Sequence, residues 1–373
     1  MTQDMARSRV TAGTPGTIAG VVAQLVALER SGGAGVLKLG RGSELKVSSL
    51  AKRYFDGGAT KGALMRYYAN MWPALKAHVV DRPLVLKRYP EGAGGPMFFQ
   101  QNAGEHVPEA VRVEAIDTRG DGPKDRIIGG DLATLLYTVQ IGAIEVHPWL
   151  SKVGDIDAAD RCLIDLDPGP DVPFRGVVAL TRAVLGVLHR CALPAAVKTS
   201  GSSGMHIVIP LPRATSYETS AALAMLIARV VTVQNPERAT VERSLRARPP
   251  GTIYVDAMQN ARGKSMACAY SVRARDGAPV SAPLEERELT ARLRTEAHSL
   301  QSMPRRVARV GDLWGNALAA RTGKKVLVNA MKLLTEMLDG AEETSALRRG
   351  KKRGVQGGAD VESRAGRPRS RRS

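Results

Sequence analysis

The sequence predicts a mixed α/β (α+β) protein. Short apolar runs that stop at Pro, Gly or Asp are typical of buried strands, whereas longer segments with apolar residues at every third or fourth position are typical of helices. The two kinds of segment alternate through the middle of the chain, and 373 residues are enough for one large domain or two medium ones.

The first part of the chain is rich in Gly, Thr and Ala and contains one helical stretch. We therefore expect residues 1–42 to form an N-terminal extension that is partly disordered, and residues 43–320 to form the main domain. That domain is expected to begin with a strand at 45–47. A turn then leads into a helix over 60–75, which Thr60 caps.

The rest of the main domain repeats the two kinds of element. Strands are predicted at 83–89, 143–147, 162–167, 195–199, 205–210 and 252–256, and helices at 131–141, 177–191 and 219–233.

Two segments follow the main domain. Residues 321–346 contain a helix over 326–338 with one apolar side, which either packs on the body or meets a partner. Residues 347–373 are rich in Arg, Gly and Ser, so we expect a disordered tail. It could hold DNA non-specifically, or it could simply keep the protein soluble.

Charge is the most informative bulk property. The chain has 54 Lys and Arg against 36 Asp and Glu, a net charge of +18. Ten of the basic residues and two of the acidic ones lie from Arg348 onward, so the remaining body still carries +10. Such a positive field favours a polyanionic partner, of which nucleic acid is the commonest soluble kind.

Other classes of protein fit poorly. No apolar run approaches the ~20 residues that span a membrane. The three cysteines (Cys162, Cys191 and Cys268) are scattered, which suits a reducing cytoplasm better than a disulfide framework or a zinc site. We expect a cytoplasmic protein with no membrane partner.

Acidic residues stand at the ends of predicted strands. Asp165 and Asp167 close one apolar run and, being two residues apart, project from the same face of the strand. Asp256 ends another. Clustered carboxylates can hold two divalent cations about 3.5–4 Å apart, which clamp the oxygens of a phosphoryl displacement. Alternatively, Asp at a strand end only caps a turn.

Several other residues have both a functional and an ordinary interpretation. Ser200 and His206 bound a Gly/Ser loop that could hold a phosphate, although a His that begins a strand is more often half-buried. Lys52 and Lys61 flank the turn before a helix, either as a phosphate cradle or as solvated charges. Gly263-Lys264-Ser265 ends like a Walker A loop, but Met258 replaces its first Gly, so we reject that motif.

Two adjacent aromatic residues, Phe98 and Phe99, lie on extended chain and cannot both face the core. An exposed one could stack on a nucleic-acid base. The ordinary alternative is that one packs inside and the other covers a sheet edge. Together with two histidines and a series of Lys and Arg residues, the carboxylates and the Gly/Ser loop supply what nucleotidyl transfer requires.

The same motifs resemble a known family. Phe98-Phe99-Gln100, Glu145-Val146-His147-Pro148-Trp149, Asp165-Leu166-Asp167-Pro168-Gly169-Pro170, Lys198-Thr199-Ser200-Gly201-Ser202 with His206, and Tyr254-Val255-Asp256 occur in the order and spacing of one domain. The chain resembles the polymerase domain of the bacterial non-homologous end-joining DNA ligase D, a member of the archaeo-eukaryotic primase superfamily. The resemblance runs from about residue 45 to 318.

The resemblance implies a primase-like fold with an RRM-like catalytic β-sheet, flanking helices and a smaller N-terminal subdomain. It also implies template-dependent addition of nucleotides, NTPs or dNTPs with ribonucleotides preferred, at gapped or broken DNA ends in the bacterial nucleoid. Two ions, Mn²⁺ or Mg²⁺, are implied as cofactors.

The resemblance also assigns roles to residues. Asp165, Asp167 and Asp256 match the catalytic metal ligands. The nucleotide pocket is matched by His147, Ser200, His206, Gln259, Lys264 and Arg273. Lys52 and Lys61 match the lysines that hold the downstream 5′-phosphate, and Phe98 and Phe99 match the aromatic pair that stacks on template bases.

The chain departs from the family pattern at two positions, where Ser203 and Gln101 replace the usual Lys. No Lys-x-Asp-Gly ligase motif is present, so we expect a free-standing polymerase that needs a separate ATP-dependent DNA ligase and could also use Ku. Two alternatives stay open: a metal-dependent nuclease, which has no use for a triphosphate pocket, and a DNA-end-binding module without catalysis.

Overall fold

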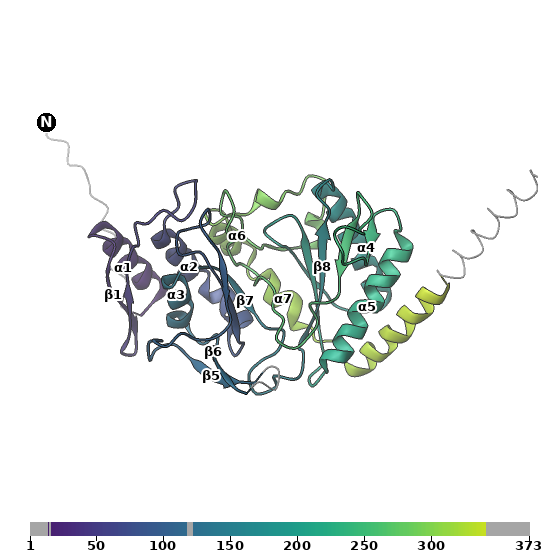
Figure 1. The fold of residues 1–373 in the computed structure, drawn as a ribbon, viewed down its shortest axis with the longest axis horizontal. Coiled ribbons are helices and arrows are strands. Elements are labelled where there is room, and N and C mark those ends of the chain that lie inside the picture. Colours follow the sequence, from purple (N-terminus) through teal and green to yellow (C-terminus); the bar gives the residue numbers. More distant parts are fainter. Residues whose placement is uncertain (1–13, 15, 118–121, 341–373) are drawn as a thin grey trace, which may run out of the picture.

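The computed structural model describes residue 14 and residues 16–117 and 122–340. Two groups of elements lie side by side along the long axis of the molecule (Figure 1). The N-terminal group contains α1 to α3, and the other is built around a six-stranded sheet. This mixed architecture confirms the predicted α/β fold.

The six-stranded sheet has the order β11-β12-β8-β10-β9-β13. Strand β8 lies near its centre and runs antiparallel to both neighbours, β10 and β12. The bounds are β8 Arg161–Pro168, β9 Ala196–Thr199, β10 Met205–Pro210, β11 Ala239–Thr240, β12 Ile253–Asp256 and β13 Pro283–Leu284. These strands confirm the four that the sequence predicts between 162 and 256.

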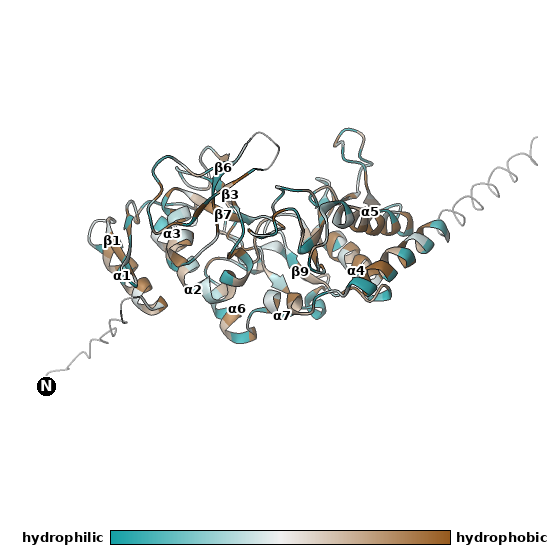
Figure 2. Cartoon of the chain, turned by 90° about the horizontal axis from the view of Figure 1, so that it is seen from below, coloured by the Kyte–Doolittle hydropathy of each residue, from teal (hydrophilic) through white to brown (hydrophobic). Residues whose placement is uncertain are grey.

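Two long helices cover one face of this sheet. They are α4 (Phe174–Arg190) and α5 (Tyr217–Gln234), and α5 begins where the side chain of Ser216 accepts a hydrogen bond from the backbone N–H of Thr219. Both helices bury apolar residues against β8 or β10. Figure 2 shows the apolar residues along these helices.

The N-terminal group combines helices with a second, three-stranded sheet. Its sheet order is β4-β3-β7. The bounds are α1 Ile18–Arg30, β1 Gly35–Gly40, β2 Ser43–Val47, α2 Lys61–Val79, β3 Leu84–Arg88, β4 Phe98–Gln100, β5 Val113–Ile116, β6 Lys124–Ile127, α3 Leu132–Gln140 and β7 Ala143–Pro148. Helices α6 (Met303–Val310) and α7 (Leu313–Ala319) contact α2, and α7 also contacts the six-stranded sheet.

The predicted boundary between residues 42 and 43 does not separate an extension from the domain. It falls in the turn of the antiparallel β1–β2 hairpin. Val21, Leu25 and Leu37 are completely buried, and α1 packs on α2. The expectation of a partly disordered extension is therefore wrong from residue 16 onward, because this segment buries apolar side chains. Residues 1–13 and 15 lie outside the described residues.

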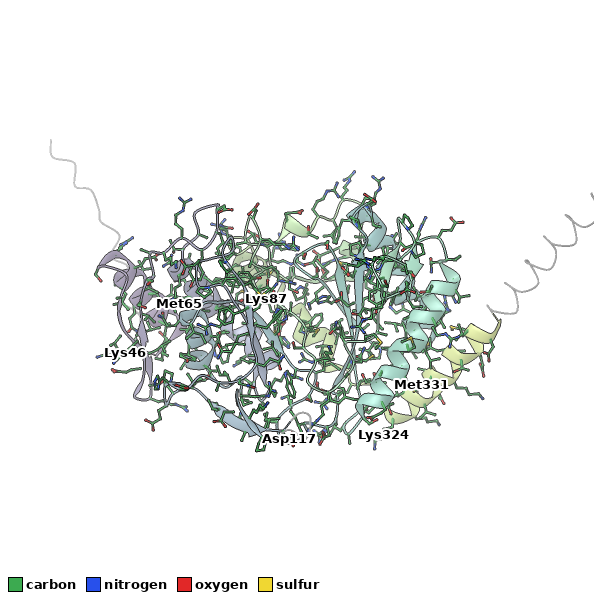
Figure 3. The ribbon with its side chains drawn as sticks, viewed as in Figure 1. Lys46, Met65, Lys87, Asp117, Lys324 and Met331 are labelled. Atoms are coloured by element: carbon green, nitrogen blue, oxygen red, sulfur yellow. The ribbon has the colours of Figure 1, made fainter. Side chains whose placement is uncertain are left out.

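The C-terminal helix packs on the body. It spans residues 324–340, and its buried side chains recur at helical spacing on one side: Leu327, Ala330, Leu334 and Leu338. It runs beside α5, on the side away from β8 (Figure 1), and its start and middle are marked by Lys324 and Met331 in Figure 3. The predicted tail lies outside the described residues.

Within the described residues, no helix combines the length and the apolar character that a membrane crossing requires.

Candidate active site

The three predicted carboxylates lie on one face of the six-stranded sheet. In the β8–β12 pair, Asp165 is directly opposite Asp256, and Asp167 is opposite Tyr254. Residues that face each other across antiparallel strands have Cβ atoms roughly 4.5–5.5 Å apart and share a face. Two adjacent strands therefore bring the carboxylates together.

The row across the sheet continues on the other side of Asp165. His206 of β10 faces Asp165, and Lys198 of β9 faces His206. His206 Nε2 lies 3.4 Å from Asp165 Oδ1, and Lys198 Nζ lies 2.5 Å from His206 Nδ1. In its charged form Lys198 can only donate, so it fixes Nδ1 as the acceptor and directs the Nε2–H of His206 to the carboxylate.

Lys198 itself is fully buried and also donates to Ser281 Oγ at 2.6 Å. Burial, and then the charge of Arg273, lowers its pKa to about 7. Sequence reasoning missed this residue as a site residue. The motif Lys198-Thr199-Ser200 contains it, but its partner Ser281 is 83 residues away in the sequence.

Burial and mutual repulsion shift the pKa values of the carboxylates Asp165 and Asp167. Burial, and then the neighbouring Asp256 and Asp167, raises the pKa of Asp165 to about 7. Burial and Asp256 also raise the pKa of Asp167, against the opposing effect of Arg248. Such a set of hard oxygen donors fits Mg²⁺ or Mn²⁺, which would neutralise the repulsion.

As the side chains lie, no three Asp, Glu, His or Cys groups of the described residues converge into a finished metal cage. Asp256 accepts hydrogen bonds from the N–H of Met258 at 2.7 Å and from Gln259 Nε2 at 3.1 Å. Asp167 Oδ2 lies 3.8 Å from Arg248, whose guanidinium carbon lies 4.7 Å from the centre of the Tyr254 ring. These contacts fix the orientation of the Asp256 and Asp167 side chains.

A small cavity of about 150 Å³ lies between Asp165 and the predicted nucleotide-binding residues. Its lining includes Asp165 together with four predicted nucleotide residues: His147, His206, Gln259 and Arg273. Lys264 is exposed and next in sequence to Ser265, which also lines the cavity.

The Gly/Ser loop is tied to the same cavity through Arg273. Ser200 Oγ accepts hydrogen bonds from the N–H groups of Ser202 at 3.1 Å and Gly204 at 3.0 Å, and its carbonyl accepts one from Arg273. Gly201 has φ +69°, and a Cβ there would lie within 3 Å of the Arg273 side chain and of the Ser281 backbone, so only glycine fits.

Glu145 of β7 organises this side of the cavity, and sequence reasoning did not assign it a role. It is 2% exposed and lies 3.0 Å from His147 Nε2, 2.9 Å from Arg273 Nε and 3.3 Å from Lys87 Nζ. Burial alone would raise its pKa, but the hydrogen bond from His147 and the charges of Arg273 and Lys87 outweigh burial and lower the pKa to about 2. Glu145 therefore orients two predicted nucleotide residues.

The two predicted phosphate-binding lysines are neighbours but have different surroundings. The N–H of Lys61 donates to the carbonyl of Lys52. Lys61 is 4% exposed, and its Nζ donates to the carbonyls of Ser48 and Gln140 at 3.1 and 2.8 Å. Burial, and then Lys52, lowers the pKa of Lys61 to about 8.

Lys52 is the more accessible of the two, with a side chain that is 34% exposed. Its Nζ contacts Glu91 at 2.8 Å and the carbonyl of Pro90 at 2.9 Å. Each lysine would have to exchange partners to bind a phosphate: Lys52 its contacts to Glu91 and Pro90 at the surface, and Lys61 two carbonyls in a buried position.

Both aromatic residues of the predicted pair are exposed. Phe98 is 45% and Phe99 57% accessible, because β4 is the edge strand of its sheet and both of its faces are open here. Arg88 lies 4.9 Å from the centre of the Phe98 ring, and Lys87 lies 6.0 Å from that of Phe99. Neither ring packs inside, so the ordinary interpretation of a buried partner is wrong.

Known proteins are similar to this chain in sequence and in structure. Residues 60–314 match the family described as "LigD, primase-polymerase domain". The multifunctional non-homologous end joining protein LigD of Pseudomonas aeruginosa is 34% identical over 266 residues, which cover 70% of this chain and 31% of that protein. The bifunctional LigD of Bacillus subtilis is 29% identical over 270 residues, covering 72% of this chain and 43% of that protein. This chain thus spans less than half the length of these relatives.

A solved structure is also similar. The polymerase domain of Mycobacterium tuberculosis ligase D, in complex with DNA, matches with a TM-score of 0.68 and 27% sequence identity. The match covers 74% of this chain and 99% of that domain. The resemblance inferred from the motifs is therefore confirmed, and the chain belongs to the LigD primase-polymerase domain family.

Proposed function

We propose that this protein is a DNA-end repair polymerase that adds nucleotides to a primer 3′-OH at gaps or double-strand breaks during end joining. As a primase-polymerase domain it is a DNA-directed nucleotidyltransferase. The observation that carries the proposal is the register that sets Asp256 opposite Asp165, beside a cavity lined by His147, His206 and Arg273.

Two divalent cations, Mn²⁺ or Mg²⁺, held by Asp165, Asp167 and Asp256 would stabilise charge on the attacking and leaving oxygens. The donor set supports this assignment, because all three ligands are carboxylates on one face whose repulsion a cation relieves.

The remaining residues of the cavity would bind and orient the nucleotide. Arg273 is held by Glu145 and by the carbonyl of Ser200, so that its charge is fixed beside the cavity before a triphosphate arrives. His147 and His206 are each oriented by one charged partner, Glu145 and Lys198 respectively. Ser200, Gln259 and Lys264 would complete the pocket.

The DNA would contact the N-terminal group of elements. Lys52, with Lys61 behind it, would hold the 5′-phosphate of the downstream strand, and the exposed rings of Phe98 and Phe99 would stack on template bases. In end joining, Ku and an ATP-dependent DNA ligase would act on the same ends.

The test is a reaction with a gapped duplex that bears a 5′-phosphate, labelled NTPs or dNTPs, and Mn²⁺. We expect template-dependent extension of the primer by the wild-type protein and none by Asp165→Asn. Asp171→Asn removes an exposed carboxylate from the turn after β8. This control variant should extend the primer as the wild-type protein does. Shortening of the primer would instead establish a nuclease, and binding without either reaction would establish a non-catalytic end-binding module.

A further inference from the structure

A second cavity lies at the other end of β8. It is lined by the start of that strand, by the end of α2 and by α7 with the chain that follows it. Arg161 and Asp165 project from the same face of β8 and are four residues, or about 13 Å, apart. This cavity shares no lining residue with the one beside the carboxylates.

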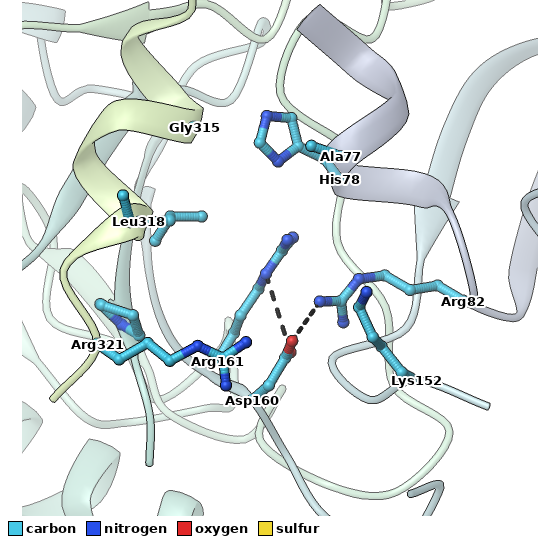
Figure 4. A pocket seen from close by; sticks show the side chains of 11 residues that line it. Ala77, His78, Arg82, Lys152, Asp160, Arg161, Gly315, Leu318 and Arg321 are labelled. Atoms are coloured by element: carbon cyan, nitrogen blue, oxygen red, sulfur yellow. Dashed lines mark hydrogen bonds and ion pairs between the residues drawn. The ribbon is translucent and has the colours of Figure 1, made fainter. Parts of the chain in front are cut away.

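Cationic groups dominate its lining. Arg82, Lys152, Arg161 and Arg321 border a space of about 180 Å³, together with His78 and a single carboxylate, Asp160 (Figure 4). Asp160 is already engaged, because Arg82 donates to its Oδ2 at 2.5 Å. Asp81 lies 3.9 Å from Lys152 Nζ but also pairs with Arg112. These two carboxylates do not balance the four cations, so the cavity has a net positive charge.

Two of the buried groups lack adequate partners. Arg161 is only 7% exposed, and its nearest carboxylate oxygen among the described residues is Asp160 Oδ1 at 3.9 Å. Burial, and then the charge of Arg82, lowers the pKa of Arg161 to about 10. His78 is 2% exposed; its Nε2 lies 3.3 Å from Asp312 Oδ2, and its Nδ1 has no hydrogen-bond partner within the described part of the chain. An anion in the cavity would pair with Arg161 directly, and with Nδ1 of His78 when that ring is protonated.

Arg321 is exposed at the rim, and the structure shows no acidic side chain of the described residues within 4 Å of it. Beside the rim a second space of about 360 Å³ shares Lys152, Asp160 and Arg321 with the first. Its other walls include Arg213, the carboxylate of Asp155 and the small side chains of Ala158 and Ala214. The first space fits one phosphate group, and the second leaves room for a small organic part.

We propose that this cavity, which we call the distal cationic pocket (Arg82, Lys152, Arg161 and Arg321 with His78), binds a small phosphate-bearing anion, either free phosphate or a phosphate monoester. Guanidinium groups pair with phosphate oxygens in a planar, bidentate geometry, which suits this ligand better than a monovalent anion. The pocket joins α2, β8 and α7, so its ligand would also tie these elements together.

Thermal unfolding in the presence of EDTA tests the proposal, with inorganic phosphate and ribose 5-phosphate as separate probes and chloride at equal ionic strength as the reference. We expect the wild-type Tm to rise by about 2 °C at a probe concentration near ten times Kd. A larger rise with ribose 5-phosphate would support a phosphate monoester as the ligand, and equal rises would support free phosphate.

Matched variants separate this pocket from non-specific effects of phosphate. Arg321→Gln should lose most of the rise, and adding Lys152→Gln should remove the rest. Arg292→Gln, which removes an exposed arginine elsewhere, and Lys264→Gln, which changes the nucleotide pocket, should respond like wild type. Equal responses of Arg321→Gln and Arg292→Gln would overturn the proposal, as would loss of the rise in Lys264→Gln alone.

A last arm repeats the measurement with saturating gapped duplex. The phosphate-dependent rise should persist, because the pocket is separate from the carboxylates. If the duplex removes it, the pocket serves a phosphate of DNA and the assignment to a small anion is wrong.

Discussion

Single residues in this site depend on partners that are distant in the sequence. Asp165 is opposed by Asp256 from a strand about 90 residues later, which follows from the β8–β12 register. Glu145 likewise fixes Arg273 from far along the chain, whereas His147 and His206 are oriented by partners close in the sequence, Glu145 and Lys198. Substitution of a ligand should therefore affect catalysis, whereas substitution of an orienting residue should also affect stability.

The carboxylate assignment predicts a separation of catalysis from binding. Asp165→Asn keeps the shape of the side chain but weakens cation binding, so we expect primer extension to fall at least about a hundredfold. The affinity for gapped DNA, measured by fluorescence anisotropy, should change less than twofold, because Asp165 is set back in the sheet. Persistent synthesis by this variant would contradict the metal assignment.

Glu145 gives a prediction about pH. Its pKa is about 2 in the fold against 4.5 in the unfolded chain, so its stabilising effect of about 3 kcal/mol is fully present above pH 4.5. It is lost progressively as the pH falls from 4.5 towards 2, because over this range the unfolded chain takes up a proton that the native state does not. Urea unfolding should show Glu145→Gln clearly less stable than wild type at pH 7, with a smaller difference at pH 3. A pH-independent difference would rule out this linkage.

The two lysines should behave differently. Lys52→Ala should weaken binding of a gapped duplex with a 5′-phosphate and leave binding of the 5′-hydroxyl duplex unchanged, since its Nζ is accessible. Lys61→Ala should show the same selectivity but also lower the free energy of unfolding, because its Nζ holds two carbonyls. Lys46→Ala on β2 is the control for a generic loss of charge. Equal loss on both duplexes would refute the phosphate role.

At the level of elements, the edge strand β4 and the C-terminal helix differ in where their apolar side chains lie. Strand β4 exposes two aromatic rings, and the helix of residues 324–340 buries its apolar side. The sequence alone could predict neither the exposure of these rings nor the burial of this helix. Two adjacent aromatic residues do not reveal whether their strand lies at an edge, and an apolar stripe does not reveal whether its partner is the same chain.

Removing the aromatic rings should weaken template binding without unfolding the protein. Phe98→Ala and Phe99→Ala should each weaken the affinity for gapped duplex by an amount in the range of ~1–3 kcal/mol per stacked base, measured by anisotropy. Val328→Ala, another exposed apolar side chain, should have no effect. Unchanged affinity in the double Phe variant would exclude stacking as the role of β4.

The C-terminal helix should contribute to stability alone. Leu334 is completely buried, so Leu334→Ala should lower the free energy of unfolding by about 2–4 kcal/mol. Extension per folded molecule should be unchanged, because the helix runs beside α5 on the side away from β8 (Figure 1), the strand that carries Asp165 and Asp167. If this variant were as stable as Val328→Ala, the observed packing of the helix would be wrong.

For the molecule as a whole, local patterns predicted the sheet and its carboxylates but not the connections between distant segments. Asp165 and Asp167 are recognisable because a two-residue spacing fixes a common face wherever a strand forms. Strand β2 was predicted at 45–47, but β1 was missed because the glycines around it suggested disorder, although Leu37 completes a buried cluster that only the folded chain defines. The distal cationic pocket draws on residues from 77 to 321, and no local spacing could indicate it.

The net charge of +18 predicts strong salt dependence of DNA binding. Removing residues 348–373, which carry +8, should weaken non-specific binding and make the plot of log K against log salt shallower, by about 0.9 for each DNA phosphate that the tail neutralises in the full chain. Titrations over roughly 50 to 300 mM NaCl would measure this slope. An unchanged slope would show that the tail does not bind DNA.

The pairing of β12 with β8 also constrains how the gene can change. The connection between β11 and β12 runs mostly through exposed residues, apart from Arg248, and can gain or lose amino acids away from Arg248 while the ladder of hydrogen bonds is kept. Deleting one residue between Tyr254 and Asp256 would instead turn the carboxylate towards α4 and α5, because neighbouring side chains on a strand point to opposite faces. Evolution can therefore vary the length of that loop around Arg248, but it can alter the strand only by substitution.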